Sequence, residues 1–353
     1  MKVNLWPDDW QVYESKSLSE KANILKKSPH TLVAQQFKRT DLERLCQLAT
    51  EIRKISKSKE GTSFLKQILC DKRAMLYFAQ PSSRTYLSFL SACQTLGLDT
   101  MDVRDSKTSS EIKGESPEDT VRTFSSYVDM IIMRHPQGGF AERVAWMLSH
   151  SNREVPVINA GSGADQHPTQ ALLDIYTLER SFEEFGGIDG KTVMFVGDLK
   201  RGRTVRSLAW LLTLYKNVKL IFSAPNDLQI SKDILELLDA SKVKYSLSNS
   251  MKDSLSEVDA VYMTRLQDEW DKDGESSSLN HSEFSLSASN LNDMRKNAVI
   301  MHPLPRRQEI NSDLDNKPQS IYWRQMRNGM WIRAALIIEA FNRSDIILDW
   351  QEG

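Results

Sequence analysis

The feature of this sequence that most limits its fold is a series of short apolar runs, separated by longer amphipathic segments. Near-continuous apolar runs predict strands that are buried on both faces, because a strand with one face in water alternates apolar and polar residues. Parallel sheets covered by helices bury their strands in this way. The predicted strands are Arg73–Phe78, Val128–Met133, Val155–Ala160, Thr192–Val196, Val218–Phe222, Ala260–Thr264 and Ala298–His302.

Helix signals lie between these runs. Thr40 is expected to cap a helix over residues 41–57, and Ser116 followed by Pro117 and two acids is typical of another helix start. A long closing helix is predicted from Tyr322 to Phe341. The fold class is therefore α/β, with two doubly wound parallel-sheet domains joined by long helices and an active site expected in the interdomain cleft.

A chain of 353 residues is long for a single core, so two domains are expected. Small residues after a strand end, at 161–165, mark the boundary between them. The first domain is predicted over residues 1–165, completed by the C-terminal helix at 322–353, and the second over residues 166–321. Near the N-terminus, Trp6 and Trp10 are expected to pack on the body of the protein.

Composition excludes several functional classes. With 46 Lys and Arg against 47 Asp and Glu, the chain has no overall bias toward nucleic acid or a membrane surface, so anions must be bound by local clusters of cations. The three cysteines and six histidines lack the close spacing of a zinc or redox site, so no metal and no cofactor is expected. The polar start and the lack of an apolar span indicate a cytoplasmic protein.

An anion site is predicted where the first strand ends. The turn Pro81-Ser82-Ser83-Arg84-Thr85 runs directly into an apolar helical pattern. N–H groups at a helix start, together with hydroxyls and an arginine, suit a phosphate. Taken alone, the turn fits a capped helix with a surface arginine equally well.

Other polar groups follow later strands. Arg134 ends one strand, and His167 and Gln170 lie at the start of a helical pattern, where both could face one bound group. A single arginine or histidine in such a place is more often solvated or packed, so each motif is weak alone.

Two further segments carry cations. The turn at 197–204 lacks the G-x-G-x-x-G spacing of a dinucleotide site, and its interleaved cations, Arg203 among them, favour a carboxylate or phosphate. Arg265 follows another strand end. At 302–306, two prolines around Leu304 fix the backbone and leave carbonyl oxygens aimed at an N–H donor such as an amide.

Taken together and in this order, these segments resemble the aspartate and ornithine carbamoyltransferases, over roughly residues 30–343. Ornithine-specific members typically read His-Pro-Cys-Gln and His-Cys-Leu-Pro, where this chain has His-Pro-Thr-Gln at 167–170 and His-Pro-Leu-Pro at 302–305. The resemblance thus implies transfer of the carbamoyl group of carbamoyl phosphate to L-aspartate. The products would be N-carbamoyl-L-aspartate and phosphate, in pyrimidine biosynthesis.

The resemblance also implies roles for single residues. It implies a carbamoyl phosphate site made of Ser82, Ser83, Arg84, Thr85, Arg134, His167, Gln170, Leu304 and Pro305. The implied aspartate site comprises Lys113, Arg203, Arg265 and Gln267. Arg84, Thr85, Arg134 and His167 are implied to be catalytic. Ser109 and Lys113 match a loop that enters the neighbouring subunit's site, which implies a homotrimer with shared active sites. Nothing in the sequence indicates whether a regulatory subunit binds.

Charge supports this assignment independently. Carbamoyl phosphate carries about two negative charges near neutral pH, and aspartate adds two carboxylates. Two anions can share a desolvated cleft only if cations compensate them. The implied site supplies such cations in Arg84, Arg134, Arg203, Arg265 and Lys113.

Four positions depart from well-known bacterial members of the family: Gln80, Tyr86, Ser162 and Trp270. Gln80 and Trp270 stand where a Glu and an Arg help hold a closed state in some members, and losing both avoids an unpaired charge. A carbamoyltransferase for another amino acid therefore stays open as an alternative. A catalytically silent scaffold is the other alternative, and the intact set of cations disfavours it.

Overall fold

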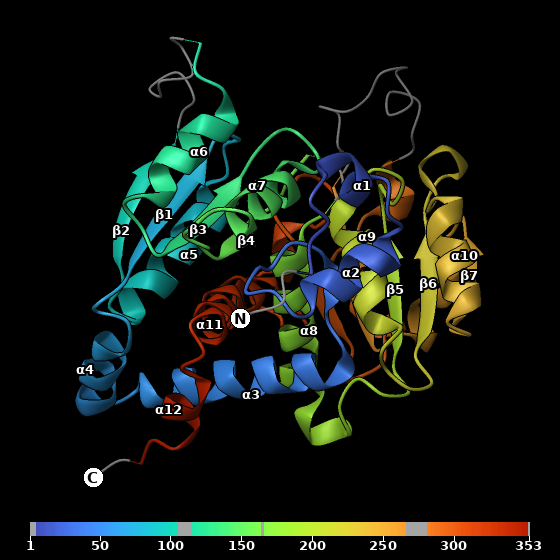
Figure 1. Cartoon of the computed structure of the whole chain (residues 1–353). Coiled ribbons are helices and arrows are strands. Elements are labelled where there is room, and N and C mark those ends of the chain that lie inside the picture. Colours follow the sequence, from blue (N-terminus) through green and yellow to red (C-terminus); the bar gives the residue numbers. More distant parts are fainter. Residues whose placement is uncertain (1–4, 105–113, 164–165, 266–280, 352–353) are drawn as a thin grey trace. The chain divides into compact units, whose positions relative to one another are not determined.

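The chain folds into two compact units, each built on a parallel sheet (Figure 1). The computed structural model describes residues 5–104, 114–163, 166–265 and 281–351. Unit 1 comprises Met1–Leu173 with Gly329–Gly353, and unit 2 comprises Asp174–Asn328. Both boundaries fall inside helices, namely α8 (Pro168–Phe182) and α11 (Tyr322–Ala340).

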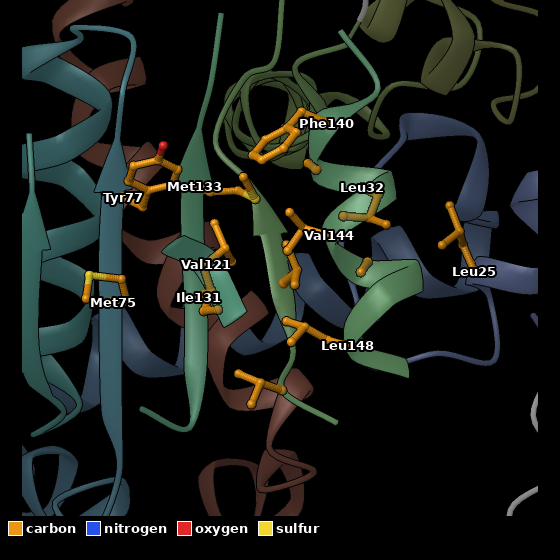
Figure 2. Close-up of a cluster of buried hydrophobic side chains, with 14 of the residues drawn as sticks. Leu25, Leu32, Met75, Tyr77, Val121, Ile131, Met133, Phe140, Val144 and Leu148 are labelled. Atoms are coloured by element: carbon orange, nitrogen blue, oxygen red, sulfur yellow. The ribbon is translucent and has the colours of Figure 1, made fainter. Parts of the chain in front are cut away.

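The sheet of unit 1 has the strand order β2-β1-β3-β4, all parallel. Its strands are β1 (Arg73–Phe78), β2 (Asp99–Val103), β3 (Met130–Arg134) and β4 (Val157–Asn159). Alternate residues of β1 and β3 pack against α6 (Pro117–Ser125) and α7 (Phe140–Ser149), as Figure 2 shows for Tyr77, Met133 and Phe140. On the opposite face, Phe78 meets Tyr86 of α5 (Ser83–Thr95). Both faces are therefore covered, as the apolar runs predicted.

The N-terminal segment packs on unit 1 through α1 (Trp10–Glu14) and α2 (Leu18–Leu25). Trp6 is buried, and the indole N–H of Trp146 donates to the Pro7 carbonyl over 2.7 Å. The Tyr13 hydroxyl donates to Glu142 over 2.8 Å. The expectation that the N-terminal tryptophans pack on the protein is confirmed.

The C-terminal segment belongs to the same unit as the N-terminal helices. Past α11, α12 (Ser344–Leu348) lies beside α3 (Arg39–Ile55). Arg343 donates to both carboxylate oxygens of Asp71, over 3.0 and 3.1 Å. Asp71 lies just after α4 (Lys59–Ile68). Arg44 Nε lies 3.3 Å from Glu339 Oε2. Unit 1 is thus assembled from the two ends of the chain.

The sheet of unit 2 has the order β7-β6-β5-β8-β9, also parallel. Its elements are β5 (Thr192–Val196), β6 (Lys219–Ser223), β7 (Lys244–Ser248), β8 (Ala260–Met263), β9 (Val299–Met301), α9 (Arg203–Leu212) and α10 (Lys232–Ala240). The chain grows outward from β5 in both directions, which is the doubly wound order. The predicted α/β class is confirmed for both units.

Short 3-10 helices complete the described chain. They are η1 (Ala34–Gln36), η4 (Glu183–Phe185), η5 (Asn226–Leu228), η6 (Lys252–Glu257), η8 (His281–Phe284), η9 (Ala288–Asp293) and η10 (Ser312–Leu314). Within the described ranges, no helix combines the length and the apolar character that crossing a membrane requires.

One of the two predicted helix starts is wrong. Ser116 does cap α6, since its Oγ accepts the Asp119 N–H over 3.1 Å. Thr40, by contrast, lies inside α3, which begins at Arg39 after the N-cap Lys38. The Lys38 N–H donates to the Asp41 carboxylate over 2.7 Å, so Asp41 closes the first turn instead of the threonine.

His30 is a buried titratable group in unit 1. The residue is 1% exposed, and its Nδ1 accepts the Val157 N–H over 3.0 Å, while Nε2 lies 3.0 Å from Ser149 Oγ. Burial lowers the pKa of His30 from 6.5 to about 3. The imidazole therefore stays neutral in the folded chain at pH values where it would be protonated in the unfolded chain.

We expect acid to destabilise unit 1 through this group. Below pH 6.5, His30 binds a proton in the unfolded state but stays neutral in the folded state. The free energy of unfolding therefore falls as pH drops toward the folded pKa of about 3. Between pH 7 and 5 this loss amounts to about 2 kcal/mol. Urea denaturation at both pH values measures it. A His30→Asn variant, which keeps an acceptor for Val157, should lose less stability over the same interval, and an equal loss would contradict this role.

Candidate active site

The turn between β1 and α5 lies at the carboxyl end of the unit 1 sheet. Ser82 is extended, and its hydroxyl donates to Thr85 Oγ1 over 3.0 Å. Thr85 is buried, whereas Ser83 and Arg84 are exposed on the first turn of α5. No side chain of the described residues caps this helix. A helix N-terminus of this kind attracts anions through its N–H groups and its dipole.

Arg134, Gly161 and His167 meet at the carboxyl ends of β3 and β4. A β-carbon on Gly161 would lie 2.5 Å from Arg134 Nη1 and 3.1 Å from His167 Cδ2, so glycine is required for this approach. Gly161 has a φ of +113°, which side chains with a β-carbon rarely adopt. Arg134 and His167 are 8% and 5% exposed. A guanidinium and an imidazole therefore flank one backbone position.

The turn between β1 and α5 lies directly beside Arg134. Phe78 pairs with Arg134 in the register of β1 and β3, and the Gln80 N–H donates to the Arg134 carbonyl over 3.2 Å. The structure thus brings together, within unit 1, the predicted phosphate turn, the strand-end arginine and the helix-start histidine.

His167 and Gln170 occupy the first turn of α8. The His167 carbonyl accepts the N–H groups of Gln170 and Ala171, over 3.0 and 3.2 Å. Residues three apart on a helix share a face. Gln170 is 6% exposed, so both side chains are held against the protein.

Three of the four departures from the family pattern lie around this group. Gln80 supplies the N–H that reaches Arg134. The Ser162 hydroxyl accepts from the Asn159 side chain over 3.1 Å, and Asn159 Oδ1 accepts the Gly161 N–H over 2.8 Å. Tyr86 is covered by the guanidinium of Arg104, 4.3 Å above its ring. Ser162 thus helps to hold the Gly161 turn.

In unit 2, the ends of β5 and β8 lie side by side. The Thr264 N–H donates to the Val196 carbonyl over 2.8 Å, and a β-carbon on Gly197 would lie 2.4 Å from the Thr264 carbonyl oxygen. Arg203 begins α9 after Gly202, and no described side chain caps that helix. Arg265 follows Thr264 directly. Both predicted aspartate-binding arginines therefore follow neighbouring strand ends.

The segment after β9 holds Leu304 in an unusual backbone conformation. Leu304 has a φ of +56° and a cis peptide bond to Pro305. Its N–H donates to Nδ1 of His302 over 2.7 Å, and His302 Nε2 lies 2.8 Å from Glu309 Oε1. Burial raises the pKa of Glu309, but hydrogen bonds from His302 and from the Arg307 N–H outweigh it, so the pKa lies below its usual value.

Two arginines of the motifs are engaged in ion pairs within unit 2. Arg201 Nη1 lies 3.5 Å from Oδ2 of the fully buried Asp198, and the Arg201 N–H donates to Oδ1 over 3.1 Å. Arg306 forms a two-pronged pair with Asp315, with Nη2 2.7 Å from Oδ2. These arginines neutralise carboxylates of the protein itself.

Ser109, Lys113, Gln267 and Trp270 lie outside the described residues. Across the part of the chain that the structure does describe, no group of three or more His, Cys, Asp or Glu side chains could hold a metal ion.

Comparison with protein families matches both units of the chain. Residues 29–180 match the model described as aspartate/ornithine carbamoyltransferase, carbamoyl-P binding domain. Residues 189–339 match its Asp/Orn binding domain. The chain belongs to the aspartate/ornithine carbamoyltransferase family.

Curated carbamoyltransferases from distant lineages are similar over most of the chain. Aspartate carbamoyltransferase 1 of Pisum sativum, described as chloroplastic, is 42% identical over 86% of this chain and 76% of its own length. The catalytic subunit of aspartate carbamoyltransferase from Methanocaldococcus jannaschii is 40% identical over 84% of this chain and 93% of its own.

Solved carbamoyltransferase structures share the fold. Aspartate transcarbamoylase from Trypanosoma cruzi, in complex with N-(phosphonacetyl)-L-aspartic acid, superposes with a TM-score of 0.79 at 33% identity, covering 88% of this chain and 95% of that one. The catalytic subunit from M. jannaschii gives a TM-score of 0.76 at 36% identity, covering 89% and 98%.

One residue of the candidate site is not predicted from the sequence. Gly161 was interpreted only as part of a domain boundary, yet its missing side chain is what allows Arg134 and His167 to approach. The available signal was a glycine placed directly after a strand end, two strands from the phosphate turn. Its partners lie 27 and 6 positions away in sequence, which no local pattern reveals.

Proposed function

We propose that this chain transfers the carbamoyl group of carbamoyl phosphate to the α-amine of L-aspartate. The amine nitrogen forms a bond to the carbamoyl carbon, and the bond from that carbon to the phosphate oxygen breaks. The amine proton passes to the leaving phosphate. The products are N-carbamoyl-L-aspartate and phosphate.

The meeting of Arg134 and His167 at Gly161 carries this proposal. Negative charge develops on the carbamoyl oxygen during attack, and donors fixed before the reaction stabilise it best. Arg134 and His167 are buried, Arg134 Nη1 donates to the Ala160 carbonyl over 3.3 Å, and Thr85 lies on the adjoining turn. In this proposal Ser82, Ser83 and Arg84 bind the phosphate, while Gln170 and the backbone of Leu304 and Pro305 bind the carbamoyl amide.

Aspartate is the proposed acceptor because unit 2 offers arginines at neighbouring strand ends. Arg203 stands at a helix N-terminus, and Arg265 follows the adjacent strand. Guanidinium groups bind carboxylates through paired hydrogen bonds. The Trypanosoma cruzi enzyme, with which this chain shares its fold, was solved with carbamoyl phosphate and aspartate together. Lys113 and Gln267 complete the proposed aspartate site.

An assay for carbamoyl phosphate-dependent product across a panel of amino acids tests the proposal. Aspartate is expected to saturate the enzyme and to give N-carbamoyl-L-aspartate with one phosphate per product. Faster turnover with ornithine or another amine would replace aspartate as acceptor. No product from any amine would favour a silent scaffold and would reject the proposal.

The assembly is proposed to be a homotrimer with shared active sites, in which Ser109 and Lys113 reach a neighbouring subunit. Two apolar side chains of unit 1, Leu87 of α5 and Met101 of β2, are 56% and 42% exposed, which suits a covered surface. Light scattering should then give three times the mass of one chain. A monomer that retains full activity would argue against shared sites. The cytoplasm stays the predicted compartment.

A further inference from the structure

A series of buried, hydrogen-bonded polar side chains lies in unit 2, close in sequence to the proposed substrate-binding residues Leu304 and Arg265. We call it the Asp174 network, and its members are Asp174, Tyr262, Gln325, His302 and Glu309. The first four are completely buried, and the Glu309 side chain is 12% exposed. They come from α8, β8, α11 and the segment that follows β9. Polar groups are rarely buried in such number without a role that offsets the loss of water.

Asp174 accepts two hydrogen bonds at the centre of the network. The Tyr262 hydroxyl donates to its Oδ2 over 2.8 Å, and Gln325 Nε2 donates to its Oδ1 over 2.7 Å. Gln325 then uses its carbonyl oxygen, which accepts the His302 N–H over 2.9 Å. Turning the Gln325 amide round would set its oxygen against the carboxylate and its NH₂ against a donor, so its orientation is fixed.

His302 continues the network with a fixed tautomer. Its Nδ1 accepts the Leu304 N–H over 2.7 Å, so Nε2 carries the proton and donates to Glu309 over 2.8 Å. Leu304 lies in the left-handed region, with a φ of +56°. The hydrogen bond from its N–H to the imidazole fixes that conformation and thereby the direction of the Leu304 carbonyl.

The network reaches both kinds of proposed substrate group within unit 2. One end is Leu304, proposed to bind the carbamoyl amide. The other end is Tyr262, three residues before Arg265, which is proposed to bind an aspartate carboxylate. Each hydrogen bond of the network can run in only one direction from donor to acceptor. A change at either end therefore alters the hydrogen bonding of the other members.

We propose that four residues are positioning residues: Asp174, Tyr262, Gln325 and His302. They fix the position of the loop that contains Leu304 relative to the strand end that precedes Arg265. The inference rests on the proposed function, because it takes the roles of Leu304 and Arg265 from there. None of these four residues is among the groups proposed to bind a substrate. The network acts by holding the two binding groups where an error of about 1 Å would slow the reaction.

Removal of one hydroxyl tests the Arg265 end. Tyr262→Phe leaves the buried Asp174 with one donor fewer, and we expect the KM for aspartate to rise about tenfold, with a smaller change in the KM for carbamoyl phosphate. Tyr13→Phe is the matched control, because Tyr13 is equally buried and also donates to a carboxylate over 2.8 Å. The control should lower the melting temperature and leave both KM values unchanged.

Replacing a hydrogen-bond donor by an acceptor at residue 325 tests the Leu304 end of the network. Gln325→Glu sets a second carboxylate against Asp174 and should lower kcat/KM about thirtyfold. Adding Asp174→Asn restores the links to Tyr262 and to residue 325, because the new amide NH₂ donates to the new carboxylate and its oxygen accepts from Tyr262. The double variant carries the same net charge as the natural chain and should recover to within about threefold.

The outcomes separate the inference from the function it rests on. Tyr262→Phe with natural KM values, or a double variant no more active than Gln325→Glu alone, overturns the network. Loss of stability with unchanged KM values in all variants reduces it to a structural role and also overturns the inference. A natural chain without carbamoyl transfer rejects the proposed function instead.

Discussion

Turnover is expected to fall about 10² to 10³-fold when Arg84 is replaced by alanine, while the fold stays intact. Arg84 is exposed on the first turn of α5, where no described side chain caps the helix. A phosphate dianion at that helix end gains most from a guanidinium that donates two parallel hydrogen bonds. The leaving phosphate gathers negative charge as its bond to carbon breaks, so the loss should appear in kcat as well as in KM.

Steady-state kinetics with carbamoyl phosphate as the varied substrate measure this loss. Arg84→Lys should recover part of it, because lysine keeps the charge and loses the planar fork. Arg44→Ala is a matched control, since Arg44 is also an exposed helical arginine of unit 1, paired with Glu339. Near-natural turnover in a folded Arg84→Ala variant would remove Arg84 from the phosphate site.

Gly161→Ala should lower kcat/KM for carbamoyl phosphate about 10²-fold. The new methyl group would lie 2.5 Å from Arg134 Nη1 and 3.2 Å from His167 Nε2, so one or both side chains must move. These are the groups proposed to stabilise the carbamoyl oxygen, so a change in their directions should slow the reaction. The arginines proposed to bind aspartate lie in unit 2, so the KM for aspartate should change less.

Gly186→Ala separates this effect from backbone strain. Gly186 has a φ of +83°, and a β-carbon there would meet no atom within 4 Å. Alanine at either position strains the backbone by about 1–2 kcal/mol, so both variants should melt earlier. Only Gly161→Ala should lose activity, and equal activities would show that the approach to Arg134 is unimportant.

The strands that sequence predicted best are those with no solvent-facing side. β1 and β5 begin and end where their apolar runs do. β2 and β7 were missed, and both are edge strands with largely polar, partly exposed sequences. Helix α5 contacts β2 and helix α10 contacts β7, but each strand is only partly buried and carries no apolar run, so pairing with a neighbouring strand is what identifies it.

The candidate site divides in the same way. The position of Arg134 at a strand end and of Arg84 just past another could be predicted, because parallel strands of one sheet bring their carboxyl ends to the same edge. The Asp174 network could not, since Asp174 and Gln325 are 151 positions apart in sequence and neither belongs to a motif. Buried hydrogen bonds pair residues by geometry, and a single sequence records no trace of such pairs.

The helices that contain the unit boundaries also set the order in which the chain can fold during synthesis. Unit 2 is one continuous stretch, Asp174–Asn328, and all its residues have been made before Gly329–Gly353 is synthesised. Unit 1 starts earlier but lacks Gly329–Gly353, with the Arg343 contacts to Asp71, until that segment has been made. A premature stop near residue 329 would therefore leave unit 2 complete, whereas unit 1 would lack the segment Gly329–Gly353.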